Sequence, residues 1–256
     1  MPIPRIYQPV SLTPDTRVQL DETASHHLMR VLRVALHETV ILFNGELWQH
    51  QQGEFECRII QFDKKKVTVD IVRFIAREVE APVRLHLAQA IARGEKMDWI
   101  LQKAVELGVT QITPLITARC NVRLDDKREE KRLTHWQAVI VSACEQSGRN
   151  QLPVIAAPVL LEKWLLQPNE VVGTYRFVLS PHQQHQHQQQ RPATLPSQAL
   201  ITLLIGPEGG LSETEVNAAV QHGFIPLTLG PRILRTETAA IAAIAIFQSW
   251  YGDMSA

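Results

Sequence analysis

A run of apolar residues leads directly into a glycine-rich turn at residues 203–212, which read LLIGPEGGLS. In an open α/β sheet, ligands bind beyond the carboxyl ends of the strands, and glycines let the backbone approach a ligand closely. The turn therefore has the composition of a binding loop, although an ordinary strand–turn–helix connection is an equally good interpretation of this segment alone. Ser212 and Glu215 predict a capping box at the start of the next helix.

The spacing of these glycines excludes three familiar sites. No lysine followed by serine or threonine completes a P-loop, and the pattern is not the GxGxxG of a dinucleotide fingerprint. A GxSxG elbow, which would indicate an α/β-hydrolase, is also missing. The turn is thus neither a phosphate loop of these kinds nor a nucleophile elbow.

A second strand ends in Gly-Pro within residues 227–240, which read LTLGPRILRTETAA. Its turn carries Arg232, Arg235 and Glu237, and such groups beside a buried helix are costly unless they are paired or functional. A structural Arg–Glu bridge that closes the turn is the alternative to a functional role. The helix that follows is rich in alanine and isoleucine, which predicts close packing, in part against a second subunit. We expect the two Gly-Pro turns to lie side by side and to form the walls of one pocket.

Strands and helices alternate in the second part of the chain. Strands are expected at residues 84–90, 112–116, 171–179, 199–205 and 225–229, and helices at 96–107, 125–147, 212–221 and 237–251. Gly108 is expected to end the first of these helices. This alternation predicts an α/β domain with a largely parallel sheet.

The first part of the chain has a different pattern. Residues 40–43, 55–60 and 67–72 have the composition of short strands, and Asn44-Gly45 is a hairpin signal. A helix is expected near residues 24–33 and a linker at 73–82. Several short strands with polar turns favour a small barrel. The expected domains are therefore residues 1–72 and 73–256.

Composition limits the possible partners. The 256 residues include 26 basic and 26 acidic side chains, so the net charge is zero and any RNA-binding surface must be a local patch. Cys57, Cys120 and Cys144 lack CxxC spacing and are expected to be free thiols in a reducing compartment. The sequence shows neither a signal peptide nor an apolar stretch long enough for a bilayer, which indicates a cytoplasmic protein without a membrane segment.

Residues 182–190 are a histidine- and glutamine-rich segment. Its histidines are of a type that ligates metals, but a metal site needs rigid geometry, and this segment offers none. We interpret it as a solvated loop and expect no metal.

The two Gly-Pro turns resemble the cofactor loops of the SPOUT methyltransferases, and more narrowly those of the bacterial 16S rRNA (uracil-N3)-methyltransferase family. Further matches to this family lie at residues 27–33 (HLMRVLR), 93–97 (RGEKM), 102–108 (QKAVELG) and 145–149 (EQSGR). The matches span nearly the whole chain. The segment 182–190 departs from the family pattern and is interpreted as a variable insertion.

This resemblance implies a C-terminal α/β domain tied in a trefoil knot, with a largely parallel sheet, and a small N-terminal PUA-like β-barrel that helps to bind RNA. It implies S-adenosyl-L-methionine as the cofactor and a homodimer with the active site near the subunit interface. The implied reaction is methylation of N3 of a specific uridine in 16S ribosomal RNA of the small ribosomal subunit.

The resemblance also assigns site residues. Arg235 is expected to stabilise the uridine anion, and Glu237 to act as the base or to orient Arg235. The residues expected to bind the cofactor are Leu204, Gly206, Pro207, Glu208, Gly209, Gly210, Leu229, Gly230, Ile233, Leu234, Thr238 and Ala239.

RNA binding requires basic side chains near the target. The candidate RNA contacts are Arg5, Arg30, Arg33, Arg93, Lys96, Arg119, Arg123 and Arg149.

Two alternatives to uridine methylation remain open. One is a ribose 2′-O-methyltransferase of the same superfamily. The other is a noncatalytic RNA-binding assembly factor, which would be expected to have degraded cofactor loops.

Overall fold

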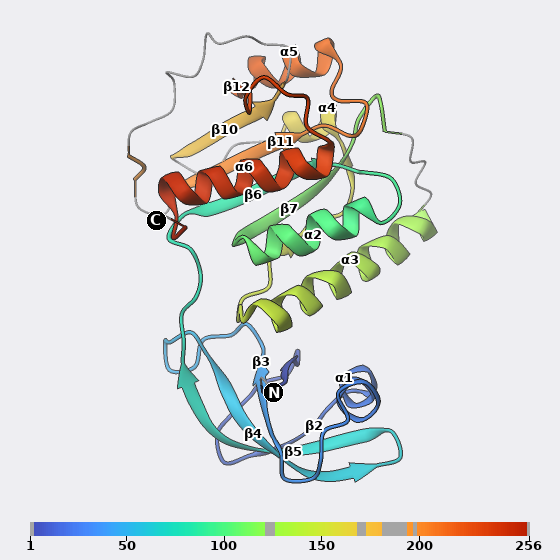
Figure 1. Ribbon diagram of the computed structural model, residues 1–256, viewed down its shortest axis with the longest axis vertical. Coiled ribbons are helices and arrows are strands. Elements are labelled where there is room, and N and C mark those ends of the chain that lie inside the picture. Colours follow the sequence, from blue (N-terminus) through green and yellow to red (C-terminus); the bar gives the residue numbers. More distant parts are fainter. Residues whose placement is uncertain (1–2, 121–125, 168–172, 181–193, 197–198, 255–256) are drawn as a thin grey trace. The chain divides into compact units, whose positions relative to one another are not determined.

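The computed structural model describes residues 3–120, 126–167, 173–180, 194–196 and 199–254 (Figure 1). The chain divides into two compact units. Unit 1 contains residues 1–80 and 141–152, and unit 2 contains residues 81–140 and 153–256. The histidine- and glutamine-rich segment 182–190 and Arg123 lie outside the described residues.

Unit 1 is built on a five-stranded sheet. Its strands are β1 (Arg5–Tyr7), β2 (Arg17–Gln19), β3 (Thr39–Phe43), β4 (Gly53–Asp63) and β5 (Lys66–Ala76), in the order β1-β3-β4-β5-β2. β1 runs parallel to β3, and the other neighbours are antiparallel. Alternate residues of β4 and β5, such as Cys57, Ile59, Val67 and Val69, are completely buried. The expected β-rich N-terminal region is therefore confirmed.

The structure refines three local expectations in unit 1. β3 and β4 pair as an antiparallel hairpin, as the Asn44-Gly45 signal predicted, but the connection extends over residues 44–52. The helical segment expected near 24–33 is confirmed and consists of α1 (Glu22–His26) followed by a π-helix, η1 (His27–Leu32). β5 continues to Ala76, into the expected linker, because residues 53–56 of β4 pair with it.

Unit 2 contains a parallel sheet. Its strands are β6 (Arg84–Ala90), β7 (Val109–Ile116), β8 (Val154–Ile155), β9 (Val159–Leu160), β10 (Thr174–Leu179), β11 (Leu200–Ile205) and β12 (Ile225–Leu227). Their order is β12-β10-β11-β6-β7-β8, with β9 also paired to β7. Every pairing is parallel. The prediction of a largely parallel sheet is confirmed.

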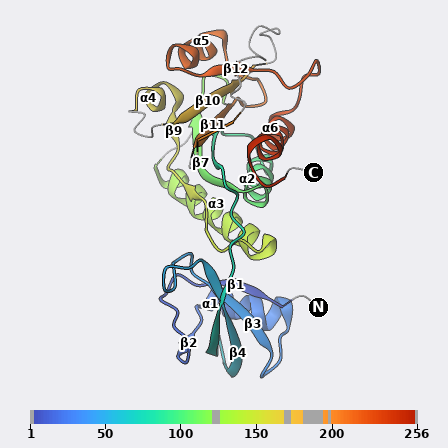
Figure 2. The same cartoon turned by 90° about the vertical axis from the view of Figure 1, so that its left-hand side faces the viewer.

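Helices cover both faces of this sheet (Figure 2). α2 (Lys96–Glu106) and α6 (Thr236–Tyr251) pack together on one face, while α4 (Leu161–Leu165) and α5 (Glu213–Gln221) cover the other. Neighbouring residues of β10 alternate accordingly: Phe177 contacts Phe247 of α6, whereas Val178 packs with Leu161 of α4 and Ala219 of α5. Gly108, with a φ of +81°, follows α2 as expected.

Helix α3 (Asp126–Ser147) begins in unit 2, but its last turns and the loop after it belong to unit 1. The reason is a set of polar contacts at its carboxyl end. The Glu145 carboxylate accepts a hydrogen bond from the backbone N–H of Tyr7 at 3.0 Å, and Arg149 donates from Nε and Nη2 to the carboxylate of Glu80. Residues 141–152 are therefore bound into the unit that the sequence alone assigns to residues 1–72.

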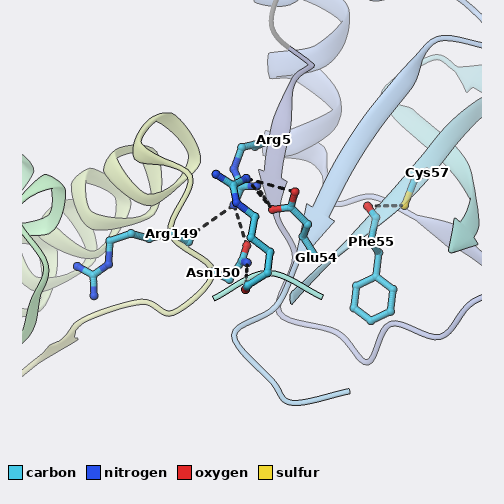
Figure 3. A network of polar contacts seen from close by, with 7 residues as sticks. Arg5, Glu54, Phe55, Cys57, Arg149 and Asn150 are labelled. Carbon is cyan, nitrogen blue, oxygen red and sulfur yellow. Dashed lines mark hydrogen bonds and ion pairs between the residues drawn. The ribbon is translucent and has the colours of Figure 1, made fainter. Parts of the chain in front are cut away.

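A buried ion pair completes this arrangement (Figure 3). The guanidinium of Arg5 pairs with Glu54 and donates to Asn150 Oδ1 at 2.8 Å and to the carbonyl of Arg149 at 3.2 Å. Arg77 approaches the same carboxylate at 3.2 Å. The Arg5 and Glu54 side chains are only 11% and 7% exposed. This charged cluster therefore serves to hold residues 149–150 on the N-terminal sheet.

We expect Arg5→Ala to lower the free energy of unfolding by about 3 kcal/mol, because it leaves the Glu54 carboxylate buried without its main partner. Urea denaturation followed by circular dichroism measures this loss. Arg17→Ala is the matched control: its pair with Asp70 is 64% and 44% exposed and screened by water, so its removal should lower the stability far less than Arg5→Ala does. Equal losses in the two variants would contradict the structural role of Arg5.

The three cysteines are free thiols, as expected. Burial raises the pKa of Cys57 and of Cys144 to about 12, so both are neutral at physiological pH. Among the described residues, no cluster of three or more histidine, cysteine, aspartate or glutamate side chains could hold a metal ion.

None of the helices in the described part of the chain has the length and apolar composition needed to cross a membrane.

Candidate active site

A cavity of about 210 Å³ lies in unit 2 where three adjacent strands end. β12, β10 and β11 are neighbours in the sheet, and their last residues, Leu227, Leu179 and Ile205, all line it. The carboxyl edge of a parallel sheet is the usual position of a ligand site. The cavity is therefore formed by residues that are distant in sequence but placed together by strand order.

Glycines shape the first wall, residues 206–211. A Cβ atom on Gly206 would lie 2.8 Å from the backbone nitrogen of Leu211, so any other residue would force the loop open. Gly210 has a φ of +68°, and its amide donates to the carbonyl of Pro207 at 2.8 Å. Ser212 then caps α5 in a capping box with Glu215, as predicted.

The second wall, residues 227–239, is tied directly to the first. The hydroxyl of Thr236 donates to the carbonyl of Gly206 at 2.6 Å. In turn, the side-chain amide of Gln89, at the end of β6, donates to the Thr236 hydroxyl at 3.0 Å. Gln89 is fully buried. The expectation that the two Gly-Pro turns lie side by side and wall one pocket is therefore confirmed.

Most of the residues expected to bind a cofactor line this cavity. Leu204 does not, because its side chain points into the core shared by the sheet, α4 and α5. Thr238 is exposed on the first turn of α6 and is also absent from the lining. The expected residues that do line it are Gly206, Pro207, Glu208, Gly209, Gly210, Leu229, Gly230, Ile233, Leu234 and Ala239.

Sequence reasoning missed several lining residues. Leu179 and Ser180 were overlooked because nothing in the sequence shows that β10 lies between β11 and β12. Gln89 does not line the cavity but supports it through Thr236, and a signal for it did exist, since it is a polar residue near the carboxyl end of a predicted strand. The other missed lining residues are Ile205, Leu211, Val216, Leu227, Thr228, Arg232 and Thr236.

Charged groups gather at the rim. Lys96 Nζ, at the start of α2, lies 3.3 Å from Glu208 Oε1 and 3.8 Å from Glu237 Oε2. Partial burial raises the pKa of Glu208, but the backbone N–H of Arg93 and the Lys96 ammonium outweigh this effect and hold the pKa below its ordinary value. Glu208 is therefore a fixed negative charge beside the cavity.

Arg235 and Glu237, expected to be catalytic, stand at the start of α6. Arg235 is the N-cap residue, and its side chain is exposed. The Glu237 side chain is only 14% exposed, and its ion pair within the described residues is with Lys96 rather than with Arg235. Both residues therefore lie next to the cavity wall. The Arg–Glu bridge that was considered as a structural alternative is not the ion pair that Glu237 makes, because its partner is Lys96.

The expected RNA contacts fall into three groups. Arg5 and Arg149 belong to the buried ion pairs of unit 1 described above. Arg30 and Arg33 are exposed on η1 and at its end, where Arg33 adopts a φ of +54°. The remaining described candidates lie at the cavity and its rim, and they are Arg93, Lys96 and Arg119.

The chain is similar to known proteins along its whole length. A family model described as an RNA methyltransferase domain matches residues 79–248, and one described as an RNA methyltransferase PUA domain matches residues 20–72. A ribosomal RNA small subunit methyltransferase E of Buchnera aphidicola is 35% identical over 99% of this chain and 98% of its own length. The protein of the same name from Bacillus subtilis is 30% identical over 86% of this chain and 85% of its own.

Two solved structures are similar in fold. A methyltransferase from Legionella pneumophila in complex with bound SAM has a TM-score of 0.90 and 40% identity, covering 99% of this chain and all of its own. A ribosomal RNA small subunit methyltransferase E from Neisseria gonorrhoeae, bound to S-adenosyl methionine, has a TM-score of 0.88 and 38% identity with the same coverage.

Proposed function

Because this chain belongs to the ribosomal RNA small subunit methyltransferase E family, with its RNA methyltransferase and PUA domains, we propose that it methylates N3 of a specific uridine in 16S ribosomal RNA with S-adenosylmethionine as the donor. The observation that carries the proposal is the cavity between two glycine-proline loops at the carboxyl edge of the parallel sheet. Both loops are intact, which argues against a noncatalytic assembly factor.

The lining fits the donor chemically. Leu179, Leu229, Ile233 and Leu234 supply apolar surface for an adenine ring, as small-molecule pockets usually do. The backbone groups of the two loops can read the polar edges of the ligand. Glu208 places a negative charge beside a ligand that carries a sulfonium and an ammonium. When bound, S-adenosylmethionine supplies an electrophilic methyl group.

The acceptor atom sets a further requirement. N3 of uridine carries a proton and becomes a good nucleophile only after losing it, which spreads negative charge over O2 and O4. A guanidinium beside these oxygens stabilises the anion, and we assign this role to Arg235, which is exposed next to the second loop. Glu237 is assigned to orient the basic groups around it, with Lys96 as its ion-pair partner.

RNA is bound by both units in this proposal. Arg30 and Arg33 offer exposed guanidinium groups on the PUA domain, and Arg93 and Lys96 offer basic groups at the rim of the cavity. We leave Arg5 and Arg149 out, since their ion pairs are buried. Arg123 stays a prediction.

We further propose that the enzyme acts as a homodimer in the cytoplasm, where its substrate resides, and that the methyltransferase domain is knotted. Support for the dimer comes from α6. One face of this helix buries Ala240, Ala243 and Phe247, while Ile246 and Trp250 on other faces remain partly exposed. A helix with apolar side chains on several faces can bury more of them against α6 or another surface of a second copy of this chain.

The decisive experiment is cofactor-dependent methylation of small ribosomal subunits from cells that lack this protein. The RNA is digested and the modified nucleoside is identified by mass spectrometry. We expect 3-methyluridine. A ribose-methylated nucleoside would instead support a 2′-O-methyltransferase. Failure of S-adenosylmethionine to bind at millimolar concentration in calorimetry would favour a noncatalytic factor.

A further inference from the structure

The segment that follows β7, residues 117–120, is held rigidly. The amide of Cys120 donates to the carbonyl of Thr117 at 3.0 Å, which closes a turn. The Cys120 thiol lies 3.4 Å from the carbonyl oxygen of Ile91, and the Ala118 amide donates to Glu215 Oε1 at 2.8 Å. Arg119 therefore stands between two anchored neighbours.

From this fixed position, the side chain of Arg119 crosses the glycine-rich loop. Its Nη1 atom donates to the carbonyl of Gly209 at 2.7 Å and is 3.5 Å from that of Leu211. Its aliphatic part packs on the same loop, because a Cβ atom on Gly209 would lie 3.3 Å from Arg119 Cβ and 3.4 Å from Cδ. Arg119 also lines the cavity. Hydrogen bonding and packing thus both direct this arginine to the loop.

Glu215 reinforces the same connection from the other side. Its Oε2 atom accepts from the amide and hydroxyl of Ser212 in the capping box, while Oε1 accepts from Ala118. One carboxylate therefore ties the segment 117–120 to the end of the glycine-rich loop. Together, Arg119 and Glu215 fix residues 209–212 from two directions.

We propose that Arg119 is a positioning residue of the methyl-donor site, which holds the glycine-rich loop in its binding conformation, and that it is not an RNA contact. A loop held in place before binding does not have to be ordered by the ligand, so the donor binds more tightly. This inference rests on the proposed function and revises the sequence-based assignment of Arg119 to RNA binding.

The test measures two affinities separately in the full chain. Calorimetry gives the Kd for S-adenosylhomocysteine, and fluorescence anisotropy gives the Kd for a 16S ribosomal RNA transcript. We expect Arg119→Ala to weaken S-adenosylhomocysteine binding about tenfold, the scale of one charge-assisted hydrogen bond, with less than about a twofold change for RNA. Steady-state kinetics should show a higher KM for S-adenosylmethionine with nearly normal kcat. Arg119→Lys keeps part of the stem and one donor, and should restore much of the affinity.

Two control variants separate an effect on S-adenosylhomocysteine affinity from an effect on RNA affinity. Arg84→Ala removes an exposed arginine at the opposite end of β6 and should change neither affinity. The double variant Arg30→Ala/Arg33→Ala should weaken RNA binding and leave the Kd for S-adenosylhomocysteine unchanged. Circular dichroism verifies that each variant is folded.

A double-mutant cycle with Gly209→Ala tests the contact itself. The added methyl meets Arg119 in the wild-type chain, but two of the three close side-chain atoms, Cγ and Cδ, are absent from Arg119→Ala. The two substitutions should therefore be non-additive in S-adenosylhomocysteine affinity.

Wild-type affinity of Arg119→Ala for S-adenosylhomocysteine would overturn the inference, as would additive effects in the cycle or a loss of RNA affinity equal to that of the Arg30/Arg33 variant. These results differ from failure of the proposed function, in which the wild-type chain itself would bind no S-adenosylhomocysteine.

Discussion

Arg235→Ala is expected to lower kcat by about 10²–10³-fold, because it removes a charged donor from the uridine anion that forms before methyl transfer. Arg235 is exposed beside the second loop and does not line the cavity, so the Kd for S-adenosylmethionine should change less than about threefold. Single-turnover methylation of small-subunit particles at saturating donor measures the chemical step, and calorimetry measures the affinity.

Arg84→Ala is the appropriate control, since it also removes an exposed arginine from unit 2 but at the amino end of β6, opposite the cavity. Turnover of Arg235→Ala within about threefold of the wild type, at saturating RNA and donor, would remove Arg235 from the catalytic role. A loss confined to donor affinity would place it in the cofactor site instead.

Gly209→Val is expected to raise the Kd for S-adenosylmethionine by at least about 100-fold. A Cβ atom at this position already lies 3.3 Å from Arg119 Cβ, and valine adds two methyl groups beyond it. The loop must then move away from Arg119 or fill the cavity that it lines. Either change removes the binding conformation, so affinity is lost although the rest of the sheet is unaffected.

Thr214→Val, an exposed position on α5 a few residues later, is the control for the change of side-chain shape. Both variants should show the circular dichroism spectrum of the wild type, and only Gly209→Val should fail to produce heat on titration with the donor. Unaltered affinity in folded Gly209→Val would contradict the place of this loop in the cofactor site.

Much of the site follows from local sequence chemistry. A buried strand that ends in Gly-Pro and leads to a Ser212 cap predicts a turn at 206–210 followed by a helix, although these residues alone did not distinguish a binding loop from an ordinary connection. The resemblance assigned ten residues that do line the cavity. Leu204, which was also expected to bind the cofactor, does not line the cavity, because strand residues alternate between two buried faces and both faces of β11 are apolar.

What could not be predicted depends on contacts between distant residues. Arg5 and Arg149 have the composition of RNA contacts, but Glu54 and Glu80, far away in sequence, bury and neutralise them. Leu179 and Ser180 entered the site only through the order of the strands. Charge alone could not distinguish an arginine that faces solvent from one that is paired within the fold.

The hydrogen bonds from Gln89 to Thr236 and from Thr236 to Gly206 also bear on how the protein is made. These residues are separated by 147 and 30 positions, so the N-terminal parts of the site leave the ribosome well before Thr236 is translated. The PUA domain and most of the sheet are synthesised first, whereas the donor pocket closes only when the final helix docks. A nascent chain therefore carries the whole N-terminal sheet before the residues that complete the donor pocket have been made.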